Sequence, residues 1–595
     1  MSSASLPVSP PLSSPLSAAV PPSTALAGRA DADHVVAHTL LNCLLREVSG
    51  PEHQTAVSDG HLLLRLPRCG VLLRVALRRA SLIGAHRFAG SVSEQRPEGW
   101  AELSWQTLAE YIHRELHLRT GVRNEEFLTQ VASSHEGVSA ALAAARREAA
   151  TPGTSGAGRA DAYMDSEQSL LFGHRFHPTP KARTGTLADW GRYAPETRAR
   201  FPLRHLAVRE EFLRQETATP GALAALDRQG TVPDGYRLLP AHPWQYAMLR
   251  DHPALVAAID RDDVLDLGPR GADFEPTASV RTLYDGRDFL KFSLNVRITN
   301  CLRKNAEYEL TGAVALTRLL EPVAADLAAR FPGTDLLREP AYRTLDLGSR
   351  ELAEGFGVIV REGLDTRLAP GVTGLLAAAV ADEYPTGGAQ LARLLGGAGP
   401  AEALAWWDAY LGLLVPPVLA AYFDHGVVLE PHLQNVVLGV DADGAPRQIL
   451  FRDLEGTKLL PEQQATALAA LAEDVARPMT YDRERGWDRV VYCLLVNHLA
   501  EMLAALADRH PRLEPELWRA VRGVLAGCAA AHGNPPLLRA LIAGVPLPAK
   551  ANLLTRWERK ADRDAGYVRI ASPLVPDLLS ATSGAARTEP WSTTP

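Results

Sequence analysis

The chain has 595 residues, which is more than one ordinary hydrophobic core requires, so two to four domains or lobes are expected. Hydrophobic residues make up 46% and charged residues 22%, as in globular proteins, and the net charge of −7 arises from mixed acidic and basic residues. This mixture gives no broad cationic surface, which argues against a nucleic-acid partner.

Residues 1–30 are rich in Ser and Pro and lack the continuous apolar stretch of a secretory signal, so we predict a disordered tail. The five cysteines are scattered without C-x-x-C spacing, which predicts neither a disulfide framework nor a structural zinc site. The apolar stretches at 375–381 and 411–423 are too short, or interrupted by Pro416 and Pro417, for a membrane span. We therefore expect a cytoplasmic protein without a membrane partner.

The N-terminal part combines helical and strand patterns. Helical apolar spacing at 34–48, short strands at 61–76 and an alanine-rich helical region at 100–150 predict an α+β lobe over 31–160. The segment 151–159, TPGTSGAGR, resembles a phosphate loop superficially. It has no following Lys-Ser/Thr and no preceding strand, so we interpret it as a linker.

The rest of the chain divides into a β-rich and a helical part. Residues 161–304 are dense in Pro, Gly, His and Arg and contain short strands, which predicts a β-rich domain. Residues 305–579 read as mainly helical, beginning with an amphipathic helix at 305–331 and interrupted by a strand pair near 436–451. Ser, Thr and Pro return at 580–595, where order is expected to end.

Residues 289–299, FLKFSLNVRIT, alternate polar and apolar side chains, which predicts a strand with one polar face. An Asp-Gly turn separates this strand from 279–282, SVRT, and favours a hairpin. Cations beside hydroxyl groups suit a polyphosphate or a polycarboxylate, and a solvated sheet face is the alternative. The neighbourhood that we predict contains Ser279, Arg281, Thr282, Lys291 and Arg303.

A second hairpin is predicted around Asp443-Gly444. Its register would bring EPHLQN and RDLEG together by pairing Asn435 with Arg452, Gln434 with Asp453, and His432 with Glu455. Carboxylates beside an amide oxygen are hard ligands suited to Mg²⁺, so this hairpin is a candidate magnesium site. The alternative is a polar sheet end held by internal ion pairs.

The segment 173–185, GHRFHPTPKARTG, holds basic side chains between two prolines that restrict the backbone, as an anion site would need. His174 and His177 lack an HExxH motif or a nearby thiolate pair, which favours carboxylate recognition or structural hydrogen bonding over zinc. For His242 in AHPWQ, the pattern slightly favours a structural role over contact with a ligand. Lys550 could cap a site from another lobe or face solvent.

Seven segments together resemble the siderophore synthetases that work independently of nonribosomal peptide synthetases, the aerobactin synthetase family. In chain order they are GHRFHPTPKARTG, AHPWQ, SVRT, KFSLNVRITNCLR, EPHLQN, FRDLEG and AKANLLTRW. The resemblance runs from Tyr163 to Trp557. It implies an α+β fold with a three-part, hand-like architecture: an N-terminal thumb, β-rich fingers and a helical palm, with an ATP pocket distantly similar to that of kinases.

The resemblance also implies a reaction. MgATP activates a carboxylate of citrate or a related acid as an acyl adenylate, pyrophosphate leaves, and an amine or hydroxylamine forms an amide or ester with release of AMP. The nucleotide and phosphate contacts it implies are Ser279, Arg281, Thr282, Lys291, Arg303, His432, Gln434 and Asn435. The acid contacts it implies are His174, His177, Lys181, Thr299, Arg303 and Lys550, and the magnesium ligands are Asp453, Asn435 and Glu455. Catalysis is expected to depend most on Arg303, His432 and Lys291.

The segment RITNCLRKNAEYEL is more similar to family members that use free citrate, while no pattern identifies the amine. A kinase-like phosphotransferase would release ADP, but the loop beside His432 offers Glu430 rather than a catalytic Asp. A non-catalytic citrate or metal-chelate binding protein would need no nucleotide. The family resemblance also suggests a homodimer.

Overall fold

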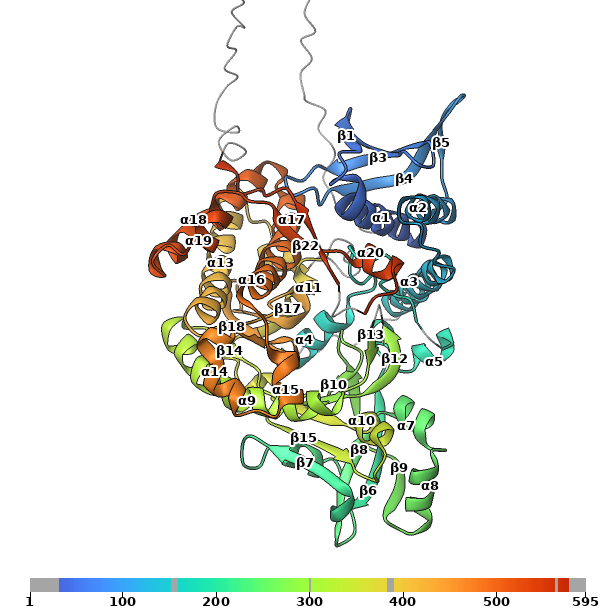
Figure 1. Cartoon of the computed structure of the whole chain (residues 1–595), viewed down its shortest axis with the longest axis vertical. Coiled ribbons are helices and arrows are strands. Elements are labelled where there is room, and N and C mark those ends of the chain that lie inside the picture. The colour runs from blue at the N-terminus through green and yellow to red at the C-terminus, as the bar shows by residue number, and fades with distance from the viewer. Residues whose placement is uncertain are drawn as a thin grey trace, which may run out of the picture.

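The computed structural model describes residues 31–150, 159–183, 185–298, 301–382, 390–561 and 565–576. Helices and strands are mixed in the α+β manner that the sequence predicts, with an N-terminal lobe, a central sheet and a largely helical C-terminal half (Figure 1). The predicted linker at 151–159 lies outside the described residues except for its last position, and both predicted tails, 1–30 and 580–595, lie outside them.

The N-terminal lobe is an antiparallel sheet packed against helices. Strands β1 to β5 are neighbours in chain order and span Thr55–Ser58, His61–Leu66, Val71–Arg79, Arg87–Arg96 and Gly99–Glu102. The helices are α1 (Ala32–Leu44), α2 (Trp105–Thr120) and α3 (Glu126–Ala150). Alternate side chains of β2 are buried against these helices, because a strand points successive residues to opposite faces. The predicted helix–strand–helix order of this lobe is confirmed.

A segment close to the C-terminus completes the same lobe. Helix α20 (Asn552–Trp557) lies beside α1 and α3 in Figure 1, and Trp557 is fully buried in the N-terminal core. The Glu47 carboxylate accepts two backbone N–H groups from the first turn of α20, both at 2.9 Å. This cap fixes the helix that follows strand β22 (Leu547–Lys550), so Lys550 is held next to the N-terminal lobe.

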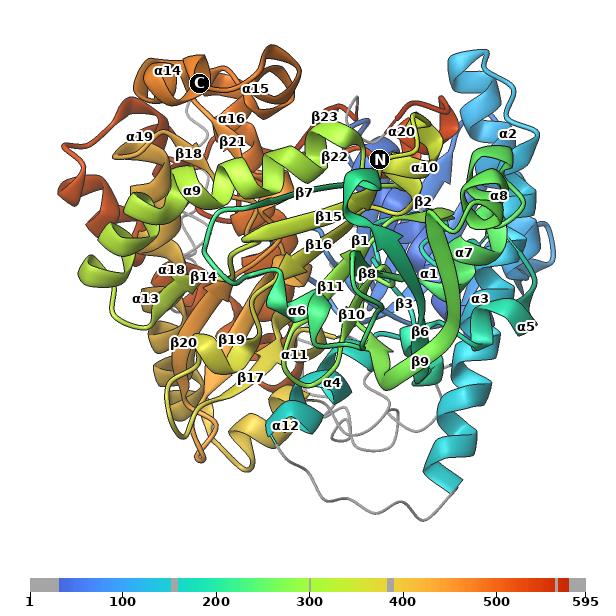
Figure 2. The ribbon, with the colours of Figure 1, turned by 90° about the horizontal axis from the view of Figure 1, so that it is seen from below.

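The central sheet has eight antiparallel strands in the order β7-β15-β16-β11-β10-β9-β6-β8. In chain order they are β6 (Phe201–Arg209), β7 (Leu213–Thr217), β8 (Tyr236–Ala241), β9 (Val264–Pro276), β10 (Thr282–Tyr284), β11 (Phe289–Phe292), β15 (Ala341–Leu345) and β16 (Val358–Arg361). Strand direction turns between the β7–β15 side and the β6–β9 side, so the sheet curls (Figure 2). Because β15 and β16 follow residue 304, the β-rich part extends beyond the boundary predicted there, and the other domain boundaries stay predictions.

The C-terminal half is mainly helical around a four-stranded sheet of order β14-β20-β19-β17. Its strands span Thr334–Leu336, Pro446–Phe451, Val436–Val440 and Thr373–Leu376 in that order. The longer helices are α9 (Glu307–Arg330), α13 (Pro400–Phe423), α18 (Glu514–Ala531) and a rod made of α16 (Arg483–Val491), the π-helical turn η8 (Tyr492–Leu499) and α17 (Ala500–Arg509). Shorter helices include α4 (Arg159–Gln168), α7 (Pro243–Leu249), α8 (Pro253–Asp260), α14 (Pro461–Ala469), α15 (Glu473–Met479) and α19 (Pro536–Ile542).

Helix α13 continues through Pro416 and Pro417, so these prolines do not end the helix that contains the apolar stretch 411–423. Pro417 has no N–H for the carbonyl of Leu413, and the Thr334 hydroxyl donates a hydrogen bond to that carbonyl at 3.3 Å instead. By length and composition, α13 and the rod could each cross a membrane, but 61% and 89% of their apolar windows are buried inside the protein. Both helices are therefore buried to the extent typical of helices in a protein core.

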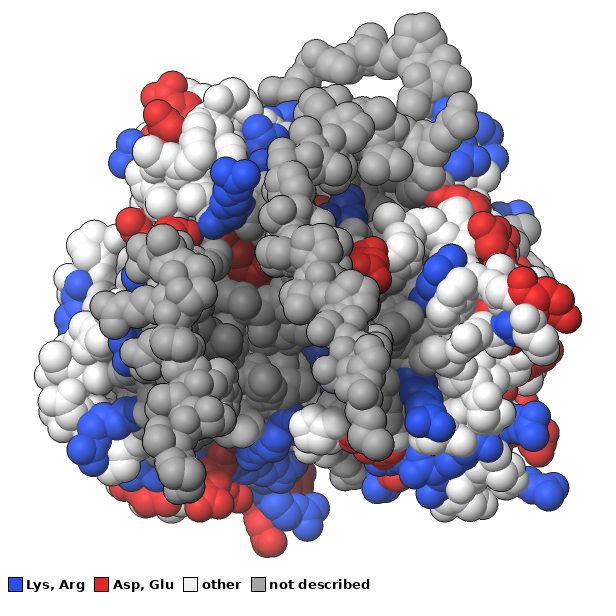
Figure 3. All heavy atoms as spheres, turned by 90° about the horizontal axis from the view of Figure 1, so that it is seen from above, with Lys and Arg blue, Asp and Glu red and all other residues white. Residues whose placement is uncertain are grey.

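The surface carries charges of both signs. On the face in Figure 3, Lys and Arg side chains are interspersed with Asp and Glu. Partly exposed ion pairs of the chain include Arg569 with Asp488 at 2.6 Å. Exposed pairs of this kind stabilise a fold by less than about 1 kcal/mol, so the buried charges described next matter more.

Candidate active site

The turn at 277–282 brings the first predicted phosphate contacts to the end of β10. Val280 has φ 68°, a left-handed conformation that is costly for a β-branched residue. Two hydroxyl groups hold the turn: Thr277 donates to the Thr282 carbonyl at 2.9 Å, and Ser279 accepts the Thr282 N–H at 3.2 Å. Strain of this kind concentrates at ligand clamps, as expected if the turn positions Arg281 for a ligand.

Lys291 lies at the centre of the site. It is fully buried on β11 and pairs with Thr282 of β10, which confirms the predicted hairpin. Its Nζ lies 2.5 Å from Asp453 Oδ1, 2.8 Å from Glu455 Oε2 and 3.7 Å from Glu339 Oε1. The alternative of a solvated sheet face is therefore wrong for this position.

Two arginines complete a network that we call the charge cluster, defined as Arg281, Lys291, Arg361, Glu339, Asp453 and Glu455. Arg281 donates to Glu455 and to Asn305 Oδ1, both at 2.7 Å. Arg361 donates to Glu339 at 2.6 Å and to Asp453 at 3.0 Å. The sequence predicts a site role for neither Arg361 nor Glu339. The one feature that marks Arg361 in the sequence is that it ends the apolar run VIVR of β16.

The cations keep their carboxylate partners ionised. Burial opposes ionisation of Asp453, but Lys291 and Arg361 outweigh it and hold the pKa of Asp453 well below its ordinary range. Burial also opposes ionisation of Glu455, whose pKa Lys291 and Arg281 lower to about 2. Burial and then Glu455 raise the pKa of nearby Glu309 to about 7. At neutral pH the cluster thus contains the ionised carboxylates of Asp453 and Glu455 beside three cations.

The second hairpin has the predicted register as far as Asn435 and Arg452. The pairings predicted beyond them, Gln434 with Asp453 and His432 with Glu455, do not continue the ladder, because short 3-10 turns at Leu433–Asn435 and Leu454–Gly456 end the two strands. Val436 pairs with Phe451, and the Arg452 N–H donates to the Asn435 carbonyl at 3.0 Å, one step further along the ladder. Asp453 follows with φ 70°, an uncommon conformation that Asp tolerates better than most residues. The hairpin therefore brings Asn435 and Asp453 to the same end of the sheet.

Arg452 anchors the base of this hairpin. Its Nε donates to the Gln434 carbonyl at 2.9 Å, and its guanidinium pairs with buried Glu167 and donates to the Tyr163 hydroxyl at 2.6 Å. Glu167 lies on α4, so the pair ties the hairpin to a distant part of the chain. Removing one partner of a buried pair is strongly destabilising, which makes Arg452 structural.

A second group of polar side chains lies beside the cluster. His174 Nδ1 accepts the Phe176 N–H at 3.1 Å, and its Nε2 lies 2.8 Å from Asn497 Nδ2. Burial, then the charges of Arg46, His432 and Lys550, lowers the pKa of His174 to about 3. Burial also lowers the pKa of His432. The charge of Asp453 raises that pKa and the charge of Lys550 lowers it, but burial has the larger effect. The predicted nucleotide and acid residues therefore adjoin at His432, and both imidazoles are neutral at pH 7.

Two other predicted acid contacts have structural partners. Lys181 Nζ donates to the Leu170 carbonyl at 2.8 Å and lies 3.5 Å from buried Glu196. His177 Nδ1 accepts the Thr179 N–H at 3.2 Å. These bonds shape the 173–185 loop, and a role of either side chain in binding the acid stays a prediction.

The predicted strand 289–299 is divided at Ser293 into β11 and β12 (Leu294–Ile298), and β12 pairs with β13 (Cys301–Arg303). Thr299 lies outside the described residues, as does the side chain of Arg303. The expected convergence of phosphate and carboxylate contacts on Arg303 therefore stays a prediction.

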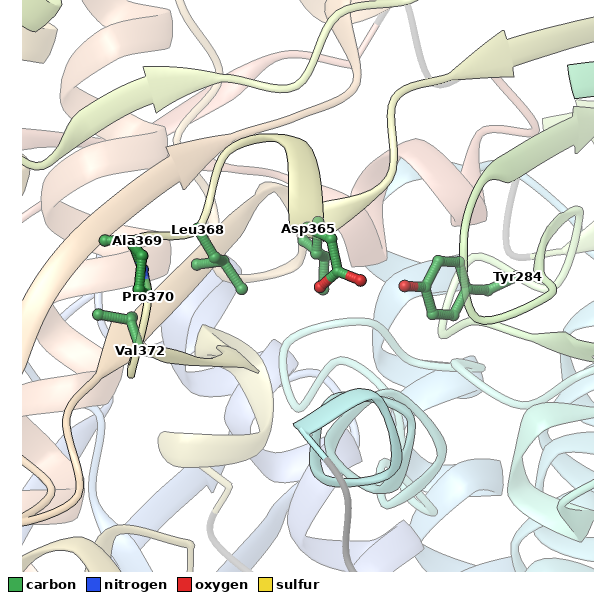
Figure 4. Close-up of a pocket in the computed structure, with 7 residues that line it drawn as sticks. Tyr284, Asp365, Leu368, Ala369, Pro370 and Val372 are labelled. Carbon is green, nitrogen blue, oxygen red and sulfur yellow. The ribbon is translucent and has the colours of Figure 1, made fainter. Parts of the chain in front are cut away.

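A small surface pocket is separate from these residues. It has a volume of about 240 Å³, and Figure 4 shows the Tyr284 hydroxyl and the Asp365 carboxylate directed toward one another at one end. Its other lining residues are Leu364, Leu368, Ala369, Pro370 and Val372. The lining contains no cation for a triphosphate and the volume is below that of typical ligand sites, so the charge cluster remains the better nucleotide site.

His498 supports the segment that carries His432. Its Nδ1 lies 2.7 Å from the Pro431 carbonyl, and its Nε2 is hydrogen-bonded to the Tyr410 hydroxyl. Both His498 and His242 are buried, and burial lowers their pKa values to about 4 and about 3. Neither ring is charged at neutral pH.

We expect the thermal unfolding midpoint to fall as the pH drops from 6.5 towards 4. In that window the unfolded chain protonates these histidines and the folded chain does not, so stability is constant above pH 6.5 and decreases below it. Replacing His498 by Gln should reduce the fall between pH 7.5 and 5.0 by about 2–4 °C. His61→Gln, at an exposed ring bonded to the Asp59 carbonyl, is the control. Identical pH profiles for H498Q and the unmodified protein would refute this linkage.

Comparison with known proteins agrees with this arrangement. A family model described as the IucA / IucC family matches residues 162–382, and one described as a ferric iron reductase FhuF-like transporter matches residues 404–565. The rhizobactin siderophore biosynthesis protein RhbC of Rhizobium meliloti is 30% identical over 573 residues, which cover 90% of this chain and 96% of that protein. The spermidine-citrate ligase of Bacillus anthracis is 31% identical over 452 residues, 70% of this chain and 74% of that protein.

A solved structure extends the likeness to the fold. The ATP-bound aerobactin synthetase IucA of Klebsiella pneumoniae superposes with a TM-score of 0.80 at 25% identity, covering 91% of this chain and 99% of that one. The curled antiparallel sheet and the helical regions are thus shared. The chain belongs to the IucA/IucC family of siderophore synthetases, which confirms the resemblance seen in the sequence.

Proposed function

We propose that this protein is an ATP-dependent ligase that joins a carboxylate of citrate, or of a related acid, to an amine or hydroxylamine in siderophore synthesis. The observation that carries the proposal is the charge cluster, in which Arg281, Lys291 and Arg361 gather around two carboxylates. The charges of Asp453 in that cluster and of Lys550 also act on the pKa of His432, which joins the predicted nucleotide and acid residues. A triphosphate and a polycarboxylate repel each other, and adjacent cationic sites relieve that repulsion. The names of the relatives, a spermidine-citrate ligase and an ATP-bound synthetase, support the same two substrates.

The reaction proceeds in two steps. A carboxylate oxygen of the acid attacks the α-phosphorus of ATP, and the bond to pyrophosphate breaks to give an acyl adenylate. The amine then attacks the acyl carbon, and AMP leaves with the bonding electron pair. Arg281, Lys291 and Arg361 supply positive charge for the phosphate oxygens, and neutral His432 offers a hydrogen bond between the two substrates.

The residues present fit a magnesium ion shared with the nucleotide. Asp453 and Glu455 present oxygens to the same ammonium group, so two carboxylates lie together beside Asn435. Within the described residues no group of three or more His, Cys, Asp or Glu could hold a metal. Mg²⁺ takes one or two carboxylates plus phosphates, which is the number of carboxylates that Asp453 and Glu455 provide. When bound, the ion would supply charge neutralisation at the phosphates. Asp453, Glu455 and Asn435 would hold it.

Three finer features belong to the same proposal. The N-terminal lobe, the central sheet and the helical half would act as thumb, fingers and palm, and the facing Lys291 and Glu339 support a distantly kinase-like ATP pocket. The consumption of ATP supports a cytoplasmic location. A homodimer stays a prediction from the family resemblance.

The proposal is tested by measuring AMP and pyrophosphate release from MgATP with an amine mixture and a panel of citrate, 2-oxoglutarate, succinate and a citryl monoamide. We expect AMP release that depends on citrate. ADP in place of AMP would identify a phosphotransferase, and intact ATP with every acid would favour a binding protein.

A further inference from the structure

Arg46, on the π-helical turn η2 (Leu45–Ser49) that continues α1, is a buried cation without a carboxylate partner. It is only 8% exposed, and its guanidinium carbon lies 3.0 Å from the centre of the Phe176 ring. It forms neither a hydrogen bond nor an ion pair with any residue that the structure describes, and its nitrogen atoms are not sealed from solvent. A guanidinium stacked on a ring has its orientation fixed while its five N–H donors remain available.

The neighbouring carboxylates are already engaged. Glu47 accepts two N–H groups of α20, and Glu501 lies 3.2 Å from Arg175 and 3.6 Å from Arg87. Arg175 differs from Arg46 in this respect, because besides its ion pair with Glu501 it donates hydrogen bonds to Asn42 Oδ1 and to the His86 carbonyl. Burying a cation without a partner is unfavourable, and no anionic partner of Arg46 is found among the residues that the structure describes, which leaves its guanidinium available to an anionic ligand.

Several contacts place Arg46 at the acid site. Phe176, on which it stacks, is two residues from His174, and the Phe176 carbonyl accepts a hydrogen bond from Asn552 Nδ2 at 2.9 Å. Asn552 begins the helix directly after Lys550 and Ala551, so three distant segments meet here. The charge of Arg46 is the largest influence after burial on the pKa of His174, ahead of His432 and Lys550.

We propose that Arg46 binds a carboxylate of the acid substrate, so that the N-terminal lobe supplies a recognition residue to the acid site. This inference rests on the proposed function. While one carboxylate of the acid reacts, Arg46 and Lys550 together can pair with two further carboxylates. A free tricarboxylic acid keeps a carboxylate for Arg46, whereas its monoamide has one carboxylate fewer to offer. Arg46 therefore selects the free acid over the amidated one.

The test compares Arg46→Met, which keeps a long side chain on Phe176, with Arg46→Lys, using AMP release as the readout. In R46M we expect the KM for citrate to rise about 50-fold and the KM for ATP to change less than twofold. R46K should fall between R46M and the unmodified protein, because an ammonium lacks the fork of donors. The preference for citrate over a citryl monoamide, as a ratio of kcat/KM, should decrease at least tenfold in R46M.

Arg74→Met is the matched control, because Arg74 stacks on Trp100 in the same lobe at 4.4 Å from the ring centre. All its kinetic constants should stay within twofold. A citrate KM within twofold in R46M, or KM values for citrate and ATP that rise together in R46M and R46K, would overturn the proposal. Should R46M fold poorly, R46K decides. If the unmodified protein releases no AMP with any acid, the proposed function fails. The role of Arg46 is then tested by thermal unfolding with citrate: the midpoint of the unmodified protein should rise and that of R46M should not, and an equal rise in both would overturn the proposal.

Discussion

Asp453→Asn will lower kcat/KM for citrate-dependent AMP release by about 10³-fold or more while leaving the protein folded. Asparagine has the same shape but no charge, so the site loses the carboxylate best placed to hold Mg²⁺ and to align Lys291 and Arg361. The fold should survive because Lys291 keeps Glu455 and Arg361 keeps Glu339 as partners. The unfolding midpoint of D453N should accordingly fall by no more than a few degrees.

Asp441→Asn provides the control from the other end of the same hairpin. Asp441 pairs with Arg447 at 2.6 Å and accepts the N–H groups of Asp443 and Ala445, so it also combines an ion pair with backbone contacts. D441N should turn over citrate within twofold of the unmodified protein. Normal AMP release by D453N across a Mg²⁺ titration would remove Asp453 from the metal role.

Local patterns predict both hairpins of the site. Period-two alternation and Asp-Gly turns fix register over a few residues, so the pairing of Thr282 with Lys291 and the step from Val436 to Asn435 follow from the sequence. Lys291 illustrates the limit of such patterns. Alternation shows that its side chain lies on a polar face, but burial of that face depends on Glu339 and Asp453, which belong to other segments.

Contacts between distant segments could not be predicted in this way. Arg361 reaches Asp453 across 92 positions, and α20 docks on Glu47 across about 500. A charged residue that ends an apolar strand, or lies on an N-terminal helix, is most often solvated, so the local sequence does not show that Arg361 and Arg46 are buried. The membership of β15 and β16 in the central sheet is not readable from the sequence for a related reason, because these strands join the sheet only after the intervening helix α9.

Lys291→Met should abolish activity, by about 10³-fold or more, and also destabilise the fold by roughly 3 kcal/mol. Lys291 is fully buried and contacts Asp453, Glu455 and Glu339, whose charges raise its pKa against the effect of burial. Its loss removes one positive charge and leaves the three carboxylates of the cluster facing two arginines. Lys304→Met, which removes a half-exposed ammonium 3.4 Å from Glu354, is the control and should change stability by less than 1 kcal/mol.

The double variant K291M/E455Q separates the two effects of Lys291. Glutamine at 455 removes one negative charge, so two carboxylates again face two arginines, and we expect much of the lost stability to return. Activity should not return, because neither methionine nor the remaining arginines can replace the buried ammonium at the phosphates. Chemical denaturation and AMP release measured on the same preparations give both quantities. Activity restored together with stability would mean that Lys291 only balances charge in the fold, and phosphate binding would then rest on Arg281 and Arg361.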